Sequence, residues 1–220
     1  PTDKLVKAII PNPDNSGVIV IYESASFMGV SLNIIFVSGD GEILSQGNIC
    51  DECDNPQYES HAIGDNEFVV TYKTTSSSLS AGVFSQIFSF DGSILGGENG
   101  LVISDEINDQ RSSDITYNSL LDEYLVCWND GRDTYTNDDG DEIVDLNILC
   151  SILYQENNEF IISDEIPVAA IEGSQQQNPS VFSTHAGTYM IAWEDMRSAE
   201  SIDQSLNLSF EWDAYYQEIS

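Results

Sequence analysis

Short apolar runs separated by polar turns follow one another along the whole chain. Four of them, VIVIYES, FVVTYKT, YLVCWND and YMIAWED, place an aromatic residue at an equivalent position: Tyr22, Tyr72, Trp128 and Trp193. These aromatic residues are 50, 56 and 65 residues apart, which is too long for one hairpin and suits a four-stranded sheet. Helical periodicity is nearly absent and strand-forming residues dominate each run. The pattern predicts an all-β protein.

The other parts of the unit recur in the same order. Each aromatic run is preceded by another strand and a polar turn, and is followed by a third strand. In two units this third strand ends in Asp-Gly, at 40–41 and 91–92. Asp-Gly is typical of a tight type I′ turn, which needs positive φ at both residues. A fourth stretch closes the unit and contains Ser-Asp-Glu-Ile at 104–107 and again at 163–166. Four short strands per repeated unit are typical of β-propeller blades.

We therefore expect a single propeller-like domain, residues 1–220, with about four four-stranded units. Their approximate bounds are 12–54, 55–109, 110–174 and 175–220, the last with residues 1–11 added.

The N-terminal segment carries the pattern of a closing strand. KLVKAIIPNPD resembles GLVISDEINDQ and EFIISDEIPVA, whereas the last unit runs out after its third strand. We expect residues 4–11 to complete the last unit in the same chain, which closes a ring, or in a neighbouring chain, which builds a polymer by strand addition. The start at Pro1, without Met or a signal-like segment, suggests a mature or excised piece of a longer product.

The charge balance limits the partners. Six Lys and Arg residues face 38 Asp and Glu residues, for a formal net charge of -32. Such a surface repels phosphate backbones and anionic lipids, which argues against nucleic acid and membrane-surface binding. No run of about 18 apolar residues is present, so membrane insertion is not expected. The negative field suits divalent cations, cationic partners or solubility.

The four cysteines are expected to form two disulfides, which favours an extracellular or cell-surface protein. Cys127 lies in an aromatic run and Cys150 in the next strand, so a hairpin would set them opposite one another. Cys50 and Cys53 would then close a short local loop. Zinc binding by this C-x-x-C pair is the alternative, but a second local pair of ligands is lacking.

A Trp-x-Asp-x-Arg motif occurs twice at the ends of apolar runs, formed by Trp128, Asp130, Arg132, Trp193, Asp195 and Arg197. Alternate residues of a strand share one face, so each Asp can pair with its Arg and fix the strand end. The alternative makes the Asp residues acids or bases, as in carbohydrate-processing propellers. We favour the structural interpretation, because the motif recurs in equivalent places whereas a catalytic site forms once.

The segments YLVCWNDGR and YMIAWEDMR, each followed by a strand, and FDGSILGG resemble the Trp-x-Asp-x-Arg repeats of large secreted and cell-surface proteins. These repeats are often predicted as β-propeller-like. The first two units depart from the signature, with Tyr-Glu-Ser and Tyr-Lys-Thr in its place. The resemblance implies an extracellular, multi-repeat, noncatalytic scaffold.

The acidic stretch GRDTYTNDDGDEIVD, residues 131–145, is a candidate calcium loop. Hard oxygen ligands surround Gly140 and come from Asp133, Asn137, Asp139, Asp141 and Glu142. The stretch departs from the EF-hand pattern because Tyr135 takes the first ligand position. A solvated acidic hairpin tip is therefore the favoured alternative. Asn207, in Asn-Leu-Ser, is a candidate glycosylation site.

No nucleophile elbow, phosphate-binding loop or dinucleotide fingerprint is present in the sequence. We therefore expect no catalytic residues, and no cofactor unless calcium binds. The sequence favours a noncatalytic structural or adhesive module of an extracellular polymer, fibre or cell-surface protein, with self-association or neighbouring repeats as partners and glycans as a further candidate. The alternative is a carbohydrate-binding or carbohydrate-processing β-propeller.

Overall fold

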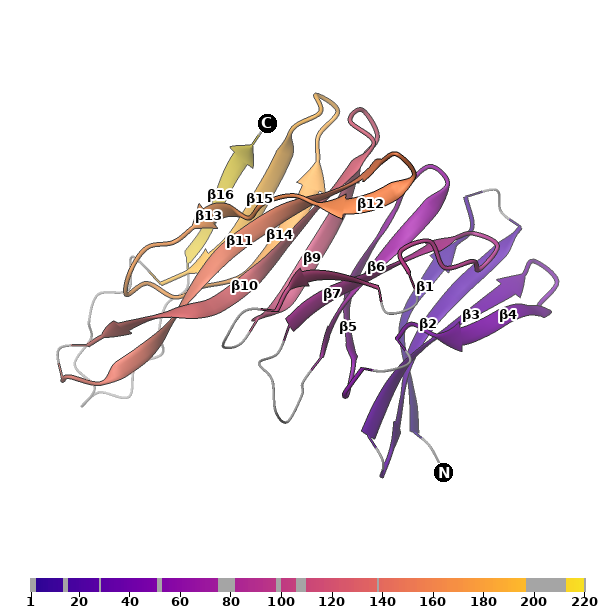
Figure 1. Ribbon diagram of the computed structural model, residues 1–220, viewed down its shortest axis with the longest axis horizontal. Helices are drawn as coiled ribbons and strands as arrows, with labels where there is room; N and C mark the ends of the chain where they lie inside the picture. The colour runs from indigo at the N-terminus through magenta and orange to yellow at the C-terminus, as the bar shows by residue number, and fades with distance from the viewer. Residues whose placement is uncertain are drawn as a thin grey trace. The chain divides into compact units, whose positions relative to one another are not determined.

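The computed structural model describes residues 3–13, 16–27, 29–50, 53–74, 82–97, 100–105, 110–137, 139–196 and 213–219. Over these ranges the chain is all-β, with sixteen strands, β1 to β16, in four antiparallel sheets (Figure 1). The chain packs as two compact units, Pro1–Asp105 and Glu106–Ser220. None of the described segments is a helix that could cross a membrane.

The first unit contains two four-stranded sheets, each a simple meander in chain order. One consists of β1 (Asp3–Pro11), β2 (Gly17–Ser26), β3 (Gly29–Ser38) and β4 (Ile43–Asn48). The other consists of β5 (Gln57–Ile63), β6 (Glu67–Thr74), β7 (Gly82–Ser89) and β8 (Leu101–Ser104).

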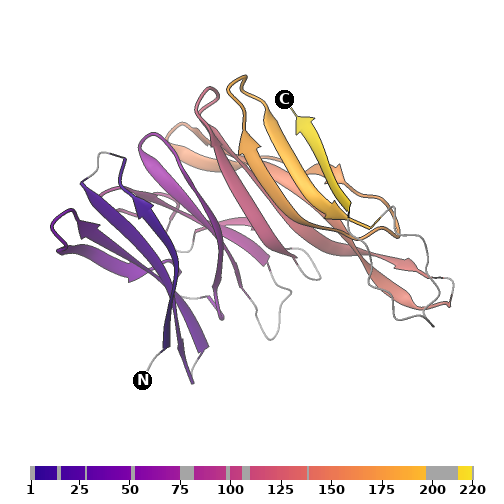
Figure 2. The same cartoon turned by 180° about the vertical axis from the view of Figure 1, so that it is seen from behind.

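The second unit also contains two antiparallel sheets, with five and three described strands. Its first sheet contains β9 (Gln110–Asn118), β10 (Glu123–Thr136), β11 (Glu142–Glu156), β12 (Glu159–Ile162) and β13 (Ile166–Ala169), and the last two both pair with β11. Its second sheet, seen from behind in Figure 2, contains β14 (Gln176–Ser183), β15 (Tyr189–Asp195) and β16 (Asp213–Ile219).

The four aromatic residues that defined the repeat occupy equivalent places in the fold. Tyr22, Tyr72, Trp128 and Trp193 lie in β2, β6, β10 and β15, the second strand of each sheet. Repeated antiparallel meanders of this kind are propeller-like. The predicted all-β, propeller-like fold with four repeated sheets is therefore confirmed.

Each unit has an apolar core to which both of its sheets contribute. In the first unit, alternate residues of β2 and β3 meet Phe68 of β6 and Phe88 of β7, whose ring centroids are 5.4 Å apart. In the second unit, Leu125 and Ile148 meet Ile191 of β15. Alternation puts every second side chain of a strand on one face, and burial of these faces holds the paired sheets together.

The N-terminal strand pairs within its own sheet, contrary to the expectation that residues 1–11 complete the last unit or a neighbour's. β1 lies antiparallel to β2, from Asp3 opposite Ala25 to Pro11 opposite Val18. The connection to β2 is a short hairpin, which makes pairing there cheap in loop-closure entropy. Ile10 is buried in the core of this unit. The prediction was wrong because the sequence pattern that the closing strands share does not specify which sheet a given strand joins.

The two Asp-Gly turns also differ from the expected type I′ geometry. Only the glycine of each pair has positive φ, 90° at Gly41 and 92° at Gly92. The amides of these glycines donate to the carbonyl groups of Ser38 and Ser89, at 3.0 Å in both turns. A type I turn followed by a left-handed glycine gives this pattern, which a longer hairpin loop uses.

Candidate functional site

The hairpin of β10 and β11 carries an unusual number of buried polar side chains. These strands have 14 and 15 residues and are longer than the others described. Near their far end, Asn129, Asp130, Asp145 and Asn147 are all buried. A buried polar group is costly unless it finds hydrogen bonds or an opposite charge. This end of the hairpin is therefore where the structure can hold a functional site.

Asp130 is fully buried, and donors from its own motif occupy its carboxylate. Trp128 Nε1 donates to Oδ2 at 3.3 Å. Arg132 donates from Nε to Oδ1 and from Nη2 to Oδ2, both at 2.7 Å, and its backbone amide donates to Oδ1 at 3.1 Å. Such a two-pronged contact fixes geometry as well as charge.

Arg132 also joins this strand to the segment between β12 and β13. Its Nη1 and Nη2 donate to the two carboxylate oxygens of Glu165 at 2.8 and 2.7 Å. The hydrogen bonds to Asp130 raise the pKa of Arg132 above its usual range, and those to Glu165 add to the effect. The first Trp-x-Asp-x-Arg motif therefore ties β10 to the connection between β12 and β13 of the same sheet.

The second copy of the motif has the same centre. Trp193 Nε1 donates to Asp195 Oδ2 at 3.1 Å, and Asp195 is fully buried. The hydroxyl of Ser174, in the segment before β14, donates to Asp195 Oδ1 at 2.7 Å. Arg197 lies outside the described residues. Tryptophan and aspartate thus repeat the same contact in both sheets of the second unit.

These contacts leave neither carboxylate open to a substrate. Asp130 accepts four hydrogen bonds, and both it and Asp195 are fully buried. A general acid or base must reach the proton that it transfers within hydrogen-bonding distance. The geometry therefore gives Asp130 and Asp195 a positioning role at the strand ends.

The structure does not bring the five candidate calcium ligands together. Asn137 Oδ1 accepts the backbone amides of Asp139 and Asp141 at 3.1 and 2.8 Å, which closes the hairpin tip. Glu142 accepts a hydrogen bond from Thr134 across the hairpin at 2.9 Å. In the described part of the chain, no three acidic, histidine or cysteine side chains form a metal-binding group.

Asp133, the fifth of these candidates, lies further down the hairpin with two residues that the sequence analysis did not select. It is the register partner of Asp145, and its Oδ2 accepts a hydrogen bond from Asn147 Nδ2 at 3.0 Å. Burial raises the pKa of Asp145, and the charges of Asp133 and Glu172 raise it further. The available signal was the alternation of Asp145 and Asn147 with apolar residues in a buried strand.

Both expected disulfides are present. Cys127 and Cys150 are register partners in β10 and β11, and their side chains are buried in the core of the second unit. Cys50 is bonded to Cys53 in the connection between the two sheets of the first unit. The zinc alternative for the C-x-x-C pair is therefore excluded in this structure, because both thiols are consumed.

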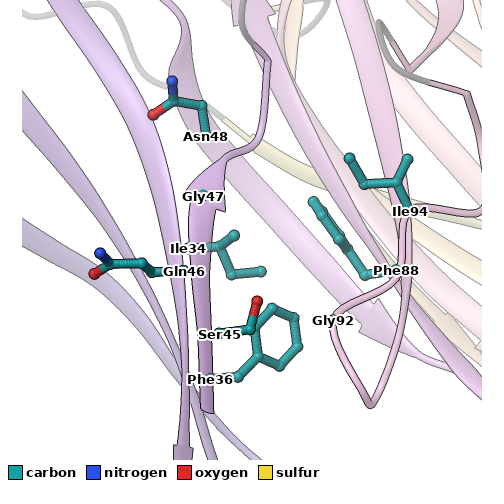
Figure 3. Close-up of a pocket in the computed structure, with 9 residues that line it drawn as sticks. All are labelled: Ile34, Phe36, Ser45, Gln46, Gly47, Asn48, Phe88, Gly92 and Ile94. Carbon is teal, nitrogen blue, oxygen red and sulfur yellow. The ribbon is translucent and has the colours of Figure 1, made fainter. Parts of the chain in front are cut away.

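A cavity of about 150 Å³ lies between the two sheets of the first unit. Figure 3 shows Ile34 and Phe36 on one side, with Phe88 and Ile94 on the other. Pockets that enclose small ligands usually exceed about 300 Å³. This small gap, which Ser45, Gln46 and Asn48 also line, is therefore interpreted as a feature of sheet packing. The candidate glycosylation residue, Asn207, lies outside the described residues.

Comparisons with known proteins bear on the fold. No protein-family model matches the chain, and no curated protein matches it. Among solved structures, the chain is similar to the GH93 alpha-L-arabinofuranosidase of Fusarium graminearum in complex with arabinobiose, with a TM-score of 0.55 and 13% identity. The match covers 99% of this chain and 67% of that one.

A weaker similarity, with a TM-score of 0.46 and 10% identity, links 88% of this chain to 26% of a prolyl endopeptidase. The arabinofuranosidase is a five-bladed β-propeller, in agreement with the four repeated sheets described above. The expectation that the protein is not an enzyme is contradicted by this neighbour, because it is a glycoside hydrolase. The comparisons therefore support a β-propeller-like fold for this chain.

Proposed function

We propose that the chain is a carbohydrate-processing module of the β-propeller class. The observation that carries the proposal is the structural similarity to an arabinofuranosidase over 99% of the chain. The alternative drawn from the sequence, a carbohydrate-binding or carbohydrate-processing propeller, thus gains support that the structural or adhesive role does not have. Self-association and neighbouring repeats as partners stay predictions.

The charge of the chain indicates which carbohydrates it can approach. A formal net charge of -32 with only six Lys and Arg residues repels sulfated and uronate-rich glycans, because like charges raise the free energy of the encounter. Neutral glycans carry no such penalty. Neutral arabinose-containing oligosaccharides are therefore the proposed substrate class, with hydrolysis of a glycosidic bond as the reaction.

The two disulfides favour an oxidising compartment, where glycans of walls and matrices are found. We therefore include secretion in this proposal. The resemblance of the two Trp-x-Asp-x-Arg motifs to repeats of secreted proteins is a further reason for it. A structural role for these motifs is compatible with catalysis by other residues of the chain, because the motifs only fix the ends of β10 and β15.

A binding experiment tests the proposed substrate class. Isothermal titration calorimetry would compare a neutral arabinan fragment with a polygalacturonate fragment of similar length, each at low and high salt. We expect heat from the neutral glycan at both salt concentrations and none from the anionic one at low salt. Preference for the anionic glycan, or no heat from any neutral arabinose-containing glycan at millimolar concentration, would contradict the proposal. Heat-unfolded protein is the control.

A further inference from the structure

Two buried oxygen atoms near the far end of the β10–β11 hairpin lack a hydrogen-bond partner. They are Asp145 Oδ1 and Asn147 Oδ1, and each residue is only 4% exposed. An unpartnered buried acceptor costs about 1–3 kcal/mol, so such atoms are expected to have a ligand in the functional protein.

The orientation of the Asn147 amide is determined by its neighbour. Its Nδ2 donates to Asp133 Oδ2 at 3.0 Å. Turning the amide over would place its oxygen against that carboxylate, which is unfavourable. The free Asn147 atom is therefore an acceptor, and the missing ligand must donate a proton or carry positive charge.

The surrounding charges favour a cation over a neutral donor. Asp133 and Asp145 are register partners across the hairpin, and the charge of Glu172 also acts on Asp145. A backbone amide, that of Gly173, donates to Asp145 Oδ2 at 3.3 Å. The nearby guanidinium of Arg132 is bound to Asp130 and Glu165. The exposed carboxylate of Asp133 and the buried one of Asp145 repel one another, and a divalent cation would remove that repulsion.

We propose that Asp133, Asp145 and Asn147 bind a calcium ion near the far end of the β10–β11 hairpin, a few residues before its tip. Two carboxylates and an amide oxygen are hard ligands of the kind that calcium prefers, and water or backbone carbonyls complete its coordination. The group contains only two acidic side chains, with the amide as the third ligand. The site differs from the hairpin tip, where Asn137 Oδ1 already accepts two backbone amides.

Bound calcium would fix the separation of β10 and β11 beyond the bulge that lies between Asp130 and Asp133. It would also fix the segment before β14, because Gly173 donates to Asp145 and Ser174 to Asp195. The ion therefore has a structural role that does not depend on the proposed carbohydrate activity.

Thermal unfolding of the full chain in calcium chloride and in EDTA tests the proposal, with Asp145→Asn as the site variant. The control is Asp139→Asn with Asp141→Asn at the hairpin tip. In the wild type and in the control, we expect calcium to raise the melting temperature by the same amount. In Asp145→Asn, the calcium affinity from titration calorimetry is expected to fall at least about tenfold.

In EDTA the variant Asp145→Asn is expected to be at least as stable as the wild type, because the substitution removes a buried charge. A second variant, Asn147→Asp, adds a carboxylate and is expected to bind calcium more tightly while being less stable in EDTA. This second variant decides the question if the first fails to fold. No effect of millimolar calcium on the wild type, or loss of the effect in the tip variant, would overturn the proposal.

Discussion

At the scale of single residues, the number of donors that reach a buried carboxylate determines what it can do. Asp130 is saturated by its own tryptophan and arginine, and Asp195 holds its tryptophan and Ser174. Asp145 is 4% exposed, slightly more than the other two, and keeps one oxygen atom without a partner. The first two are therefore structural, whereas Asp145 is poised to bind a cation.

Asp130→Asn is expected to destabilise the fold strongly. The substitution removes the charge that pairs with Arg132 and places an amide nitrogen among donors, so a cost of about 3 kcal/mol in the free energy of unfolding is expected. The matched control is Glu165→Gln, which removes the other carboxylate from the same guanidinium at a partly exposed position. It is expected to cost less than about 1 kcal/mol. Urea denaturation measures both, and equal losses would refute the central role of Asp130.

Asp145 is expected to make the protein less stable as the pH rises, provided that calcium is removed. Its pKa in the folded state is raised above the usual value of 3.8, so the folded protein holds this proton more tightly than the unfolded chain does. The protonated Asp145 carboxyl group therefore contributes to stability below its pKa in the unfolded chain. This contribution is lost as the pH rises through its pKa in the folded protein.

The measurement is the free energy of unfolding in EDTA across this acidic range for the wild type and Asp145→Asn. The free energy of unfolding of the variant is expected to rise relative to that of the wild type as the pH increases. A constant difference between the two proteins would show that Asp145 does not titrate abnormally. Asp139→Asn, at the hairpin tip, is the control for removal of a negative charge in general.

At the scale of elements, the placement of β1 can be tested with two adjacent isoleucines. Ile10 is 1% exposed in the core of the first unit, whereas Ile9 is 64% exposed on the opposite face of the strand. Ile10→Ala is expected to cost about 3 kcal/mol. Ile9→Ala is expected to change stability by less than about 0.5 kcal/mol. Guanidinium denaturation measures the free energy of unfolding of both variants. Similar, small losses for Ile10→Ala and Ile9→Ala would show that β1 does not pack in the core.

The sequence predicted elements well wherever the pattern was local and repeated. The aromatic residues at the ends of apolar runs marked the second strand of every sheet, and Cys127 and Cys150 marked the register of β10 and β11. The pairing of β1 was not predictable in this way. All closing strands share an apolar pattern, and the choice of edge depends on which core Ile10 enters and how short the hairpin to β2 is.

The polar group at Asp145 escaped sequence analysis for a related reason. Acidic residues at the hairpin tip are dense in the sequence and attracted the calcium prediction, but Asn137 uses its side chain to close the turn. Asp145 and Asn147 stand inside an apolar strand, where only the tertiary structure shows that their oxygens lack donors. Burial, and not local acidity, distinguishes the two sets.

At the scale of the whole molecule, repeated sheets and a large negative charge act together. The repeat gives a propeller-like fold, which many unrelated activities share, so the fold alone does not determine the chemistry. The proposal of a carbohydrate substrate rests on the similarity to an arabinofuranosidase, and the proposal that this substrate is neutral rests on the charge of -32. Together they define the proposed substrate class, which is neutral glycans.

Release of arabinose from neutral arabino-oligosaccharides tests this central claim most directly. The full chain would be incubated with arabinobiose and longer arabino-oligosaccharides in calcium-containing buffer, and the products separated by anion-exchange chromatography over time. We predict a steady increase in free arabinose that heat-unfolded protein does not produce. Intact oligosaccharides after prolonged incubation with folded protein, as verified by circular dichroism, would contradict the proposal that this chain processes such carbohydrates.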